Sequence, residues 1–177
     1  MNNFALEIWD DEGTRCTFYT VKLEGLTDNE TDRFFDRFTE DQENEHYDAA
    51  LELYQLISDP IKNKYGATND FINRHEARAQ ALPPKPNERL EEIAVLGSNF
   101  PLRLFCYRIN EKILILFNGG IKSAATAQDS PDLKTKFNDA QIFVKRIEDY
   151  LKHGLIEIDH SGRFLTDGTN TTDIYLH

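Results

Sequence analysis

Long apolar runs and cysteine pairs are scarce in this chain of 177 residues. The longest wholly apolar run, 113–117, has five residues, whereas a membrane-spanning helix needs about 20. The start, MNNFALEIWDDEG, carries acids where a secretory signal carries bases, so we expect no signal peptide. The two cysteines, Cys16 and Cys106, lie far apart in sequence and suggest no disulfide scaffold. We therefore expect a cytoplasmic protein that does not contact a membrane.

Basic residues are also few, and their distribution is uneven. The formal net charge is −11. Residues 1–58 hold 4 bases and 15 acids, whereas residues 102–152 hold 9 bases and 6 acids. Because phosphate contacts supply most nucleic-acid affinity, this balance argues against a general nucleic-acid binder but leaves room for a local basic site. The acidic front is interpreted as a solvated outer face, with an arm that contacts a basic surface as the alternative.

The motifs of familiar enzyme classes are missing as well. There is no P-loop, no GxGxxG, no HExxH, no CxxC and no nucleophile elbow. Glu43 and His46 form a single ExxH pair, whereas a di-iron bundle needs two such pairs and two further carboxylates. Cys106 stands inside an apolar strand and is interpreted as a buried thiol. We predict no cofactor and no metal site.

Hydrophobic periodicity in the first half predicts a hairpin followed by helices. The hairpin pairs residues 4–9 with 16–23. Thr27 and Glu30 form a capping box that starts a helix with an apolar stripe of phenylalanines at 34, 35 and 38. A second helix is expected over about 43–57, closed by Pro60.

The second half predicts a sheet and one long helix. Its expected elements, in chain order, are a possible helix start at 75 broken by Pro83, Pro84 and Pro86, a strand at 91–96, a hairpin of 102–109 with 112–117, a helix from Ser130 to 152, a hairpin of 155–158 with 163–166, and a polar tail. The fold class is α+β, with a small antiparallel sheet, two N-terminal helices and a C-terminal helix packed on it. We expect one domain, 1–177, with a core over 1–154, acidic helices at 27–58 and a C-terminal extension at 155–177.

Basic residues gather near the hairpin of 102–117. If Ile109 pairs with Lys112, Arg103 lies opposite Asn118, and Lys122 joins their face if the second strand continues. Tyr107 shares that face, where an aromatic ring can stack on a base, and Arg108 lies on the other. Two fixed cations can bind a phosphate and stabilise the charge that builds on it during transfer. Ordinary solvated charges at a strand end are the alternative.

The segment 102–151 resembles the RelE/ParE toxin superfamily, in particular its HigB and phage-derived toxin-like branch. The resemblance is carried by an early strand arginine, a tight turn, an apolar strand followed by an aliphatic-Lys pair, and a helix that starts at Ser-Pro. The matching residues are Arg103, Ile113 to Phe117, Ile121-Lys122, Ser130-Pro131, Ala140 and Asp149-Tyr150. The segment covers about 50 of the 177 residues.

The resemblance implies a toxin of a toxin–antitoxin system that cleaves messenger RNA on the ribosome and leaves a 2′,3′-cyclic phosphate. Arg103 would hold the scissile phosphate and Lys122 would stabilise charge, while Asn118, Tyr107 and Arg108 would contact RNA. The implied partners are an antitoxin protein, messenger RNA and the ribosome. Ser123 stands where the signature has a second lysine, which leaves two alternatives open: a catalytically inactive protein-interaction module on the same fold, and a ParE-like gyrase poison.

Overall fold

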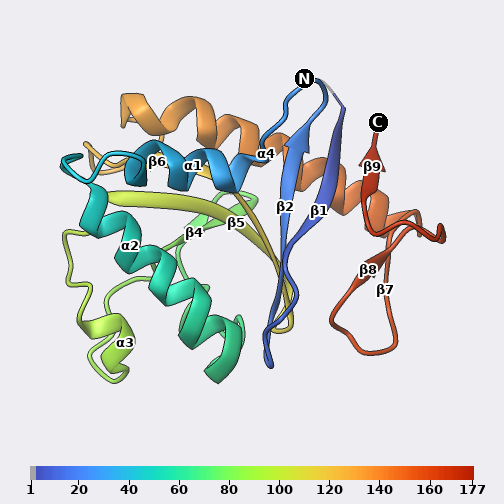
Figure 1. The fold of residues 1–177 in the computed structure, drawn as a ribbon, viewed down its shortest axis with the longest axis horizontal. Helices are drawn as coiled ribbons and strands as arrows, with labels where there is room; N and C mark the ends of the chain where they lie inside the picture. Colours follow the sequence, from blue (N-terminus) through green and yellow to red (C-terminus); the bar gives the residue numbers. More distant parts are fainter. Residues whose placement is uncertain (1–2) are drawn as a thin grey trace.

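Seven strands form one mixed sheet that runs through the molecule (Figure 1). The structure, a computed structural model, describes residues 3–177. The strands of this sheet are β1 (Phe4–Asp10), β2 (Thr17–Leu23), β3 (His75–Glu76), β4 (Ala79–Leu82), β5 (Leu102–Asn110), β6 (Ile113–Ile121) and β9 (Ile174–Leu176). Their order from edge to edge is β3, β4, β5, β6, β2, β1 and β9. The α+β class is confirmed, but the prediction of a small antiparallel sheet is wrong, because the sheet has seven strands and includes the parallel pair β2–β6.

Two antiparallel hairpins, β1–β2 and β5–β6, make up the centre of the sheet. Both are predicted from the sequence and confirmed. The parallel pairing of β2 with β6 joins them, from Thr17 opposite Ile113 to Thr20 opposite Leu116. Strands β5 and β6 therefore have a neighbour on each side, as their apolar residues on both faces predict.

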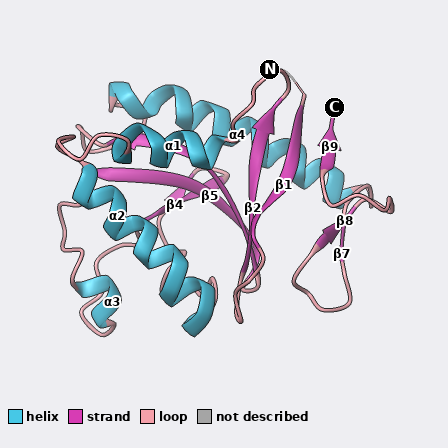
Figure 2. Ribbon diagram, viewed as in Figure 1, coloured by secondary structure: helices cyan, strands magenta, loops and turns pink. Residues whose placement is uncertain are grey.

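Helices cover both faces of the sheet (Figure 2). On one face lie α1 (Glu30–Thr39), α2 (Tyr47–Leu56) and the π-helix η1 (Ile57–Tyr65), which continues directly from α2. On the other face lies α4 (Pro131–Lys152). Each helix layer buries its apolar stripe against the sheet, so two separate hydrophobic cores form, one on each side.

The start of α1 differs from the prediction. Asn29, not Thr27, is the N-cap, and its Oδ1 accepts a hydrogen bond from the backbone N–H of Asp32 at 2.8 Å. Asparagine is a better N-cap than threonine, so α1 begins two residues later than the capping box at Thr27 predicts. The predicted phenylalanine stripe is buried: Phe34, Phe35 and Phe38.

Pro60 does not close the second helix. The chain runs from α2 through Pro60 as η1 and stops at Gly66, whose N–H donates to the carbonyl of Ile61 at 3.1 Å. A proline removes one intrahelical donor. Here Pro60 is buried together with Ile57 and Ile61. Their packing against the core stabilises the helical conformation although one backbone hydrogen bond is missing.

Three other segments also depart from the predictions. Residues 75–82 form strands β3 and β4 instead of a helix start, and residues 91–94 form the short helix α3 (Glu91–Ala94) instead of a strand. The expected terminal hairpin is present as β7 (Glu157–Ile158) and β8 (Leu165–Thr166). The tail after it is not merely polar, because β9 returns to the main sheet and pairs with β1.

The long helix α4 follows the prediction closely. It begins at Pro131 after Ser130, and its buried residues are Leu133, Phe137, Ala140, Phe143, Val144 and Ile147. Within residues 3–177, no helix combines the length and the apolar character needed to cross a bilayer.

Candidate functional site

The pairing of β5 with β6 places Arg103 at one end of the sheet. Arg103 lies opposite Gly120, and the register shifts between Leu104 and Cys106 because β6 contains a bulge. A Cβ atom on Gly119 would lie 1.8 Å from the carbonyl oxygen of Arg103. Only glycine lets the two strands approach this closely, so Gly119 sets the position of Arg103.

The Arg103 side chain is buried, with 4% of its surface exposed. Its Nη1 donates to the carbonyl oxygens of Phe100 at 2.9 Å and Leu102 at 2.8 Å. Its Nε is buried and has no hydrogen-bond partner. Burial and the nearby Arg74 guanidinium lower the pKa of Arg103 to about 10, while Glu76 opposes the shift. Leaving a donor of a charged group buried and unpaired costs free energy.

Lys122 lies beside Arg103. Both residues line an open hollow of about 430 Å³. The backbone N–H of Lys122 donates to the carbonyl of Pro101 at 2.8 Å, which ties the end of β6 to the segment before β5. The remaining lining residues are Ser98, Asn99, Phe100, Pro101, Ser123, Ala124 and Ala125. The structure thus brings together the two residues predicted to carry the chemistry.

Glu76 is a member of this charged group that the sequence did not indicate. Burial raises the pKa of its carboxyl, and the cations Arg74, Arg103 and Lys122 act on it in the opposite direction. Glu76 lies on β3, in a segment predicted as the start of a helix. Its approach to Arg103 depends on strand pairing, for which the local sequence carries no signal.

Ser130 holds the loop that forms one wall of the hollow. It is fully buried, and its Oγ accepts from the backbone N–H groups of Ser123 at 3.2 Å and Ala124 at 3.0 Å while donating to the carbonyl of Thr126 at 2.9 Å. Ser130 precedes α4 as predicted, but its side chain makes no capping bond to that helix. The side chain stabilises the wall of the hollow instead.

Asn118 does not join Arg103. Its Nδ2 donates to Oε2 of Glu30 on α1 at 2.9 Å, on the opposite side of the sheet from α4. The predicted pairing of Ile109 with Lys112 places Tyr107 opposite Leu114, and it is wrong, because Tyr107 pairs with Ile115. A shift of one residue exchanges the two faces of a strand, and the bulge then restores the face of Gly120 but not that of Asn118.

Tyr107 and Arg108 lie further along β5, and neither lines the hollow. The hydroxyl of Tyr107 donates to Oε1 of Glu148 on α4 at 3.3 Å, and burial together with that carboxylate raises the tyrosine pKa to about 12. Nη1 of Arg108 donates to the carbonyl of Ala67 at 3.0 Å, on the other face of the sheet as predicted. Both side chains therefore make structural contacts within the fold.

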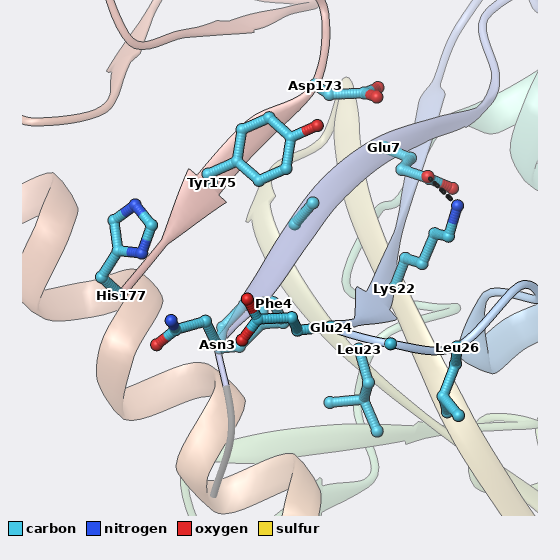
Figure 3. Close-up of a pocket in the computed structure, with 12 residues that line it drawn as sticks. Asn3, Phe4, Glu7, Lys22, Leu23, Glu24, Leu26, Asp173, Tyr175 and His177 are labelled. Atoms are coloured by element: carbon cyan, nitrogen blue, oxygen red, sulfur yellow. Dashed lines mark ion pairs between the residues drawn. The ribbon is translucent and has the colours of Figure 1, made fainter.

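A second hollow, of about 320 Å³, lies at the far end of the sheet, where β1, β2 and β9 project beyond α1 (Figures 1 and 3). Glu7 and Lys22 form an ion pair across it, with Nζ 3.7 Å from Oε1. Tyr175 and Asp173 come from β9 and the residue before it. None of the residues singled out in the sequence lies here, and the hollow is separate from Arg103.

Comparisons with known proteins provide no further guide. No protein-family model, no curated protein and no solved structure matches the chain.

Proposed function

We propose that the protein is a RelE-like toxin that cleaves messenger RNA on the ribosome. The observation that carries the proposal is a pair of cations, Arg103 and Lys122, that line one open hollow. An anion held between two such cations is stabilised by the charge of both. A phosphodiester supplies such an anion, and the hollow is open to receive it.

The arrangement of elements also supports a RelE-like core. The segment that carries the resemblance folds as the hairpin β5–β6 followed by α4, and two helices from the front of the chain cover the other face. The mixed seven-stranded sheet, with β3 and β9 at its edges, and the separate β7–β8 hairpin go beyond the small antiparallel sheet that the resemblance implies. The partners that follow from the proposal are the ribosome, messenger RNA and a neutralising antitoxin.

The proposed reaction is attack of a ribose 2′-hydroxyl on the neighbouring phosphorus. The new P–O2′ bond forms as the P–O5′ bond breaks, which leaves a 2′,3′-cyclic phosphate and a 5′-hydroxyl. Arg103 binds the non-bridging oxygens, and Lys122 neutralises the charge that builds on them. We assign Glu76 as the acceptor of the 2′-hydroxyl proton, because its carboxylate interacts electrostatically with both Arg103 and Lys122. Water supplies a proton to the departing oxygen.

Induced expression in a bacterium, with growth curves and mapping of RNA 5′ ends, tests the proposal. The wild type should arrest growth and create new 5′ ends. Lys122→Ala should reduce cleavage by about 10²-fold, the usual cost of losing one charge-stabilising group. Lys134→Ala is the matched control, because Lys134 is an exposed lysine outside the hollow, and it should cleave like the wild type.

Arg103→Lys and Glu76→Gln complete the series. Both keep much of the side-chain volume, so thermal denaturation can show that the fold is intact. Each should lose cleavage. In Arg103→Lys, a single ammonium charge replaces the planar guanidinium and cannot make its two parallel hydrogen bonds to a phosphate. A wild type that is folded, expressed and unable to create new 5′ ends would contradict the proposal.

A non-catalytic interaction module on the same fold is the second candidate. It is favoured by the lining of the hollow, where the polar side chains other than Arg103 and Lys122 are Ser98, Asn99 and Ser123. None of these three ionises in the neutral range. Absence of RNA cleavage together with a stable protein complex would support this candidate. Induction of a DNA-damage response without RNA breaks would instead support a gyrase poison.

A further inference from the structure

The outer side of α2 exposes apolar side chains to solvent. Leu51 and Tyr54 are exposed to 44% and 46%, although α2 buries its other apolar side against the core. Val95, just after α3, is exposed to 69%. Large apolar residues scattered singly are ordinary, but a contiguous group indicates a contact surface. We call this group, with the two grooves described next, the α2 surface.

Two grooves flank Leu51. The first has a volume of about 450 Å³ and lies between α2, α1 and the end of β1, lined by Trp9, Asp10, Asp32, Phe35, Asp36, Thr39, Leu51 and Tyr54. The second has a volume of about 350 Å³ and lies between α2 and α3, lined by Leu51, Glu52, Gln55, Leu56, Asp59, Pro60, Glu92, Val95 and Leu96. A helix ridge between two grooves is the shape into which a second helix packs.

The aromatic wall of the first groove is held rigidly. Nε1 of Trp9 donates to Oδ1 of Asp32 at 2.8 Å. The Trp9 ring stacks on Phe35 with centroids 6.1 Å apart, and Tyr54 meets it edge-on at 6.0 Å. Because these rings are fixed before anything binds, a partner would lose little free energy in ordering them. Tryptophan and tyrosine are also the residues that most often dominate binding energy.

The charged side chains that line the two grooves are all acidic. Within residues 27–64, all four bases already form ion pairs: Arg33 with Glu30, Arg37 with Asp132, Lys62 with Asp10, and Lys64 with Glu92. Asp36 lines the first groove, and Glu52 and Asp59 line the second. Across residues 3–177, no lysine or arginine lies within ion-pair distance of these three carboxylates. The rim therefore carries uncompensated negative charge.

We infer that the α2 surface binds a positively charged amphipathic helix of a partner protein. Its apolar side chains fill the two grooves, and its lysines or arginines lie against Asp36, Glu52 and Asp59. A second copy of this chain is disfavoured, because a symmetric contact would place the same acids against each other. Nucleic acid is disfavoured for the same reason of charge. The inference does not depend on the proposed ribonuclease activity.

Fluorescence of Trp9 tests the inference directly, since the chain has one tryptophan and it lines the first groove. The probe is a tryptophan-free amphipathic Lys/Leu peptide of about 18 residues, which spans about 27 Å as a helix. Titration at low salt should give a saturable change in Trp9 emission. The same peptide with glutamate in place of lysine should give none.

Matched variants locate the binding surface. Leu51→Ala combined with Tyr54→Ala should weaken binding by about tenfold or more, the usual effect of removing apolar anchors. Ile142→Ala is the control, because Ile142 is exposed to 41% on α4, on the other face of the sheet. Asp36→Asn, Glu52→Gln and Asp59→Asn together should also weaken binding. The equal charge change at Glu24, Glu157 and Asp173 should not.

Three results would overturn the inference. They are equal binding of the lysine and glutamate peptides, affinity unchanged by the Leu51 and Tyr54 variants, and no change in Trp9 emission at any peptide concentration. Sedimentation of the protein alone provides a fourth: a dimer that Tyr54→Ala dissociates would assign the surface to a second copy. Because the readout uses neither RNA nor growth, its failure is distinct from failure of the proposed function.

Discussion

At the scale of single residues, the site depends on a missing side chain. Gly119 passes so close to β5 that a Cβ atom would lie 1.8 Å from the carbonyl oxygen of Arg103 and 2.9 Å from the Cα of Leu104. Both neighbours are backbone atoms, so neither can turn aside. Strand β6 must move if Gly119 is replaced, and Arg103 must move with it.

We predict that Gly119→Ala lowers the free energy of unfolding by about 3 kcal/mol, the cost of a clash that shifts backbone. Chemical denaturation measures the loss. Gly97→Ala is the control, because Gly97 has a φ of +73° but no atom within 4 Å of its added Cβ. It should lose only about 1 kcal/mol, the cost of the left-handed conformation. Equal losses in both variants would show that the close approach of β5 and β6 contributes nothing.

The same scale shows which site residues the sequence could predict. Arg103 and Lys122 stand at strand ends, where alternation and the resemblance both indicate them, and they do lie together. Asn118 was misplaced because the pairing of two strands depends on turn length and on bulges, which the alternation of apolar residues does not reveal. The sequence does not indicate Glu76 as a site residue, because Glu76 lies on β3, which is distant in sequence from Arg103 and Lys122.

At the scale of elements, β9 shows how a tail becomes part of the core. Ile174 and Leu176 are buried to 1% and 0% exposure in the core under α4, while Tyr175 between them is exposed to 61%. The flanking residues are polar, so composition alone indicates a solvated tail. The strand is stabilised by its pairing with β1, from Phe4 opposite Leu176 to Leu6 opposite Ile174.

Ile174→Ala is therefore expected to lower the free energy of unfolding by about 3 kcal/mol, as in other buried aliphatic truncations. Tyr175→Ala removes a larger side chain from the same strand and should change stability by less than about 0.5 kcal/mol. Thermal or urea unfolding of the two proteins distinguishes them. If the two variants proved equally stable, β9 would not pack as the structure shows.

The mispredicted elements share one physical cause. Residues 91–96 have strand-like composition, yet residues 91–94 form the short helix α3, in which only Ile93 is buried, and Val95 just after it is exposed. Local preference is weak over so short a segment, and contacts with distant residues decide the outcome. The long helix α4 has many periodic positions that agree with one another, and it was predicted nearly to the residue.

At the scale of the whole molecule, the two helix layers differ in charge. The acidic front of the chain supplies α1 and α2 on one face, whereas the basic stretch supplies β5, β6 and α4. The sheet lies between the two layers, so the acidic α2 surface is on the opposite side from α4 and the hydrophobic core beneath it. Helices α1 and α2 together hold five acids and two bases, whereas α4 holds four acids and five bases, so the two helix layers differ in net charge.

This one-sided charge has a consequence for stability. Acids outnumber bases by 11 in residues 1–58, so repulsion among carboxylates opposes folding of this part of the chain. Raising NaCl from about 0.01 M to about 0.15 M shortens the screening length from about 30 Å to about 8 Å. We predict that the melting temperature rises over this range, by about 3 °C for each kcal/mol gained.

The combined variant Asp36→Asn, Glu52→Gln and Asp59→Asn should melt higher at low salt and respond less to NaCl, whereas the equal change at Glu24, Glu157 and Asp173 should retain more of the response. A melting temperature that falls with NaCl would mean that attractive pairs such as Lys62–Asp10 and Arg37–Asp132 outweigh the repulsion, and the front layer would then be stabilised by its charges.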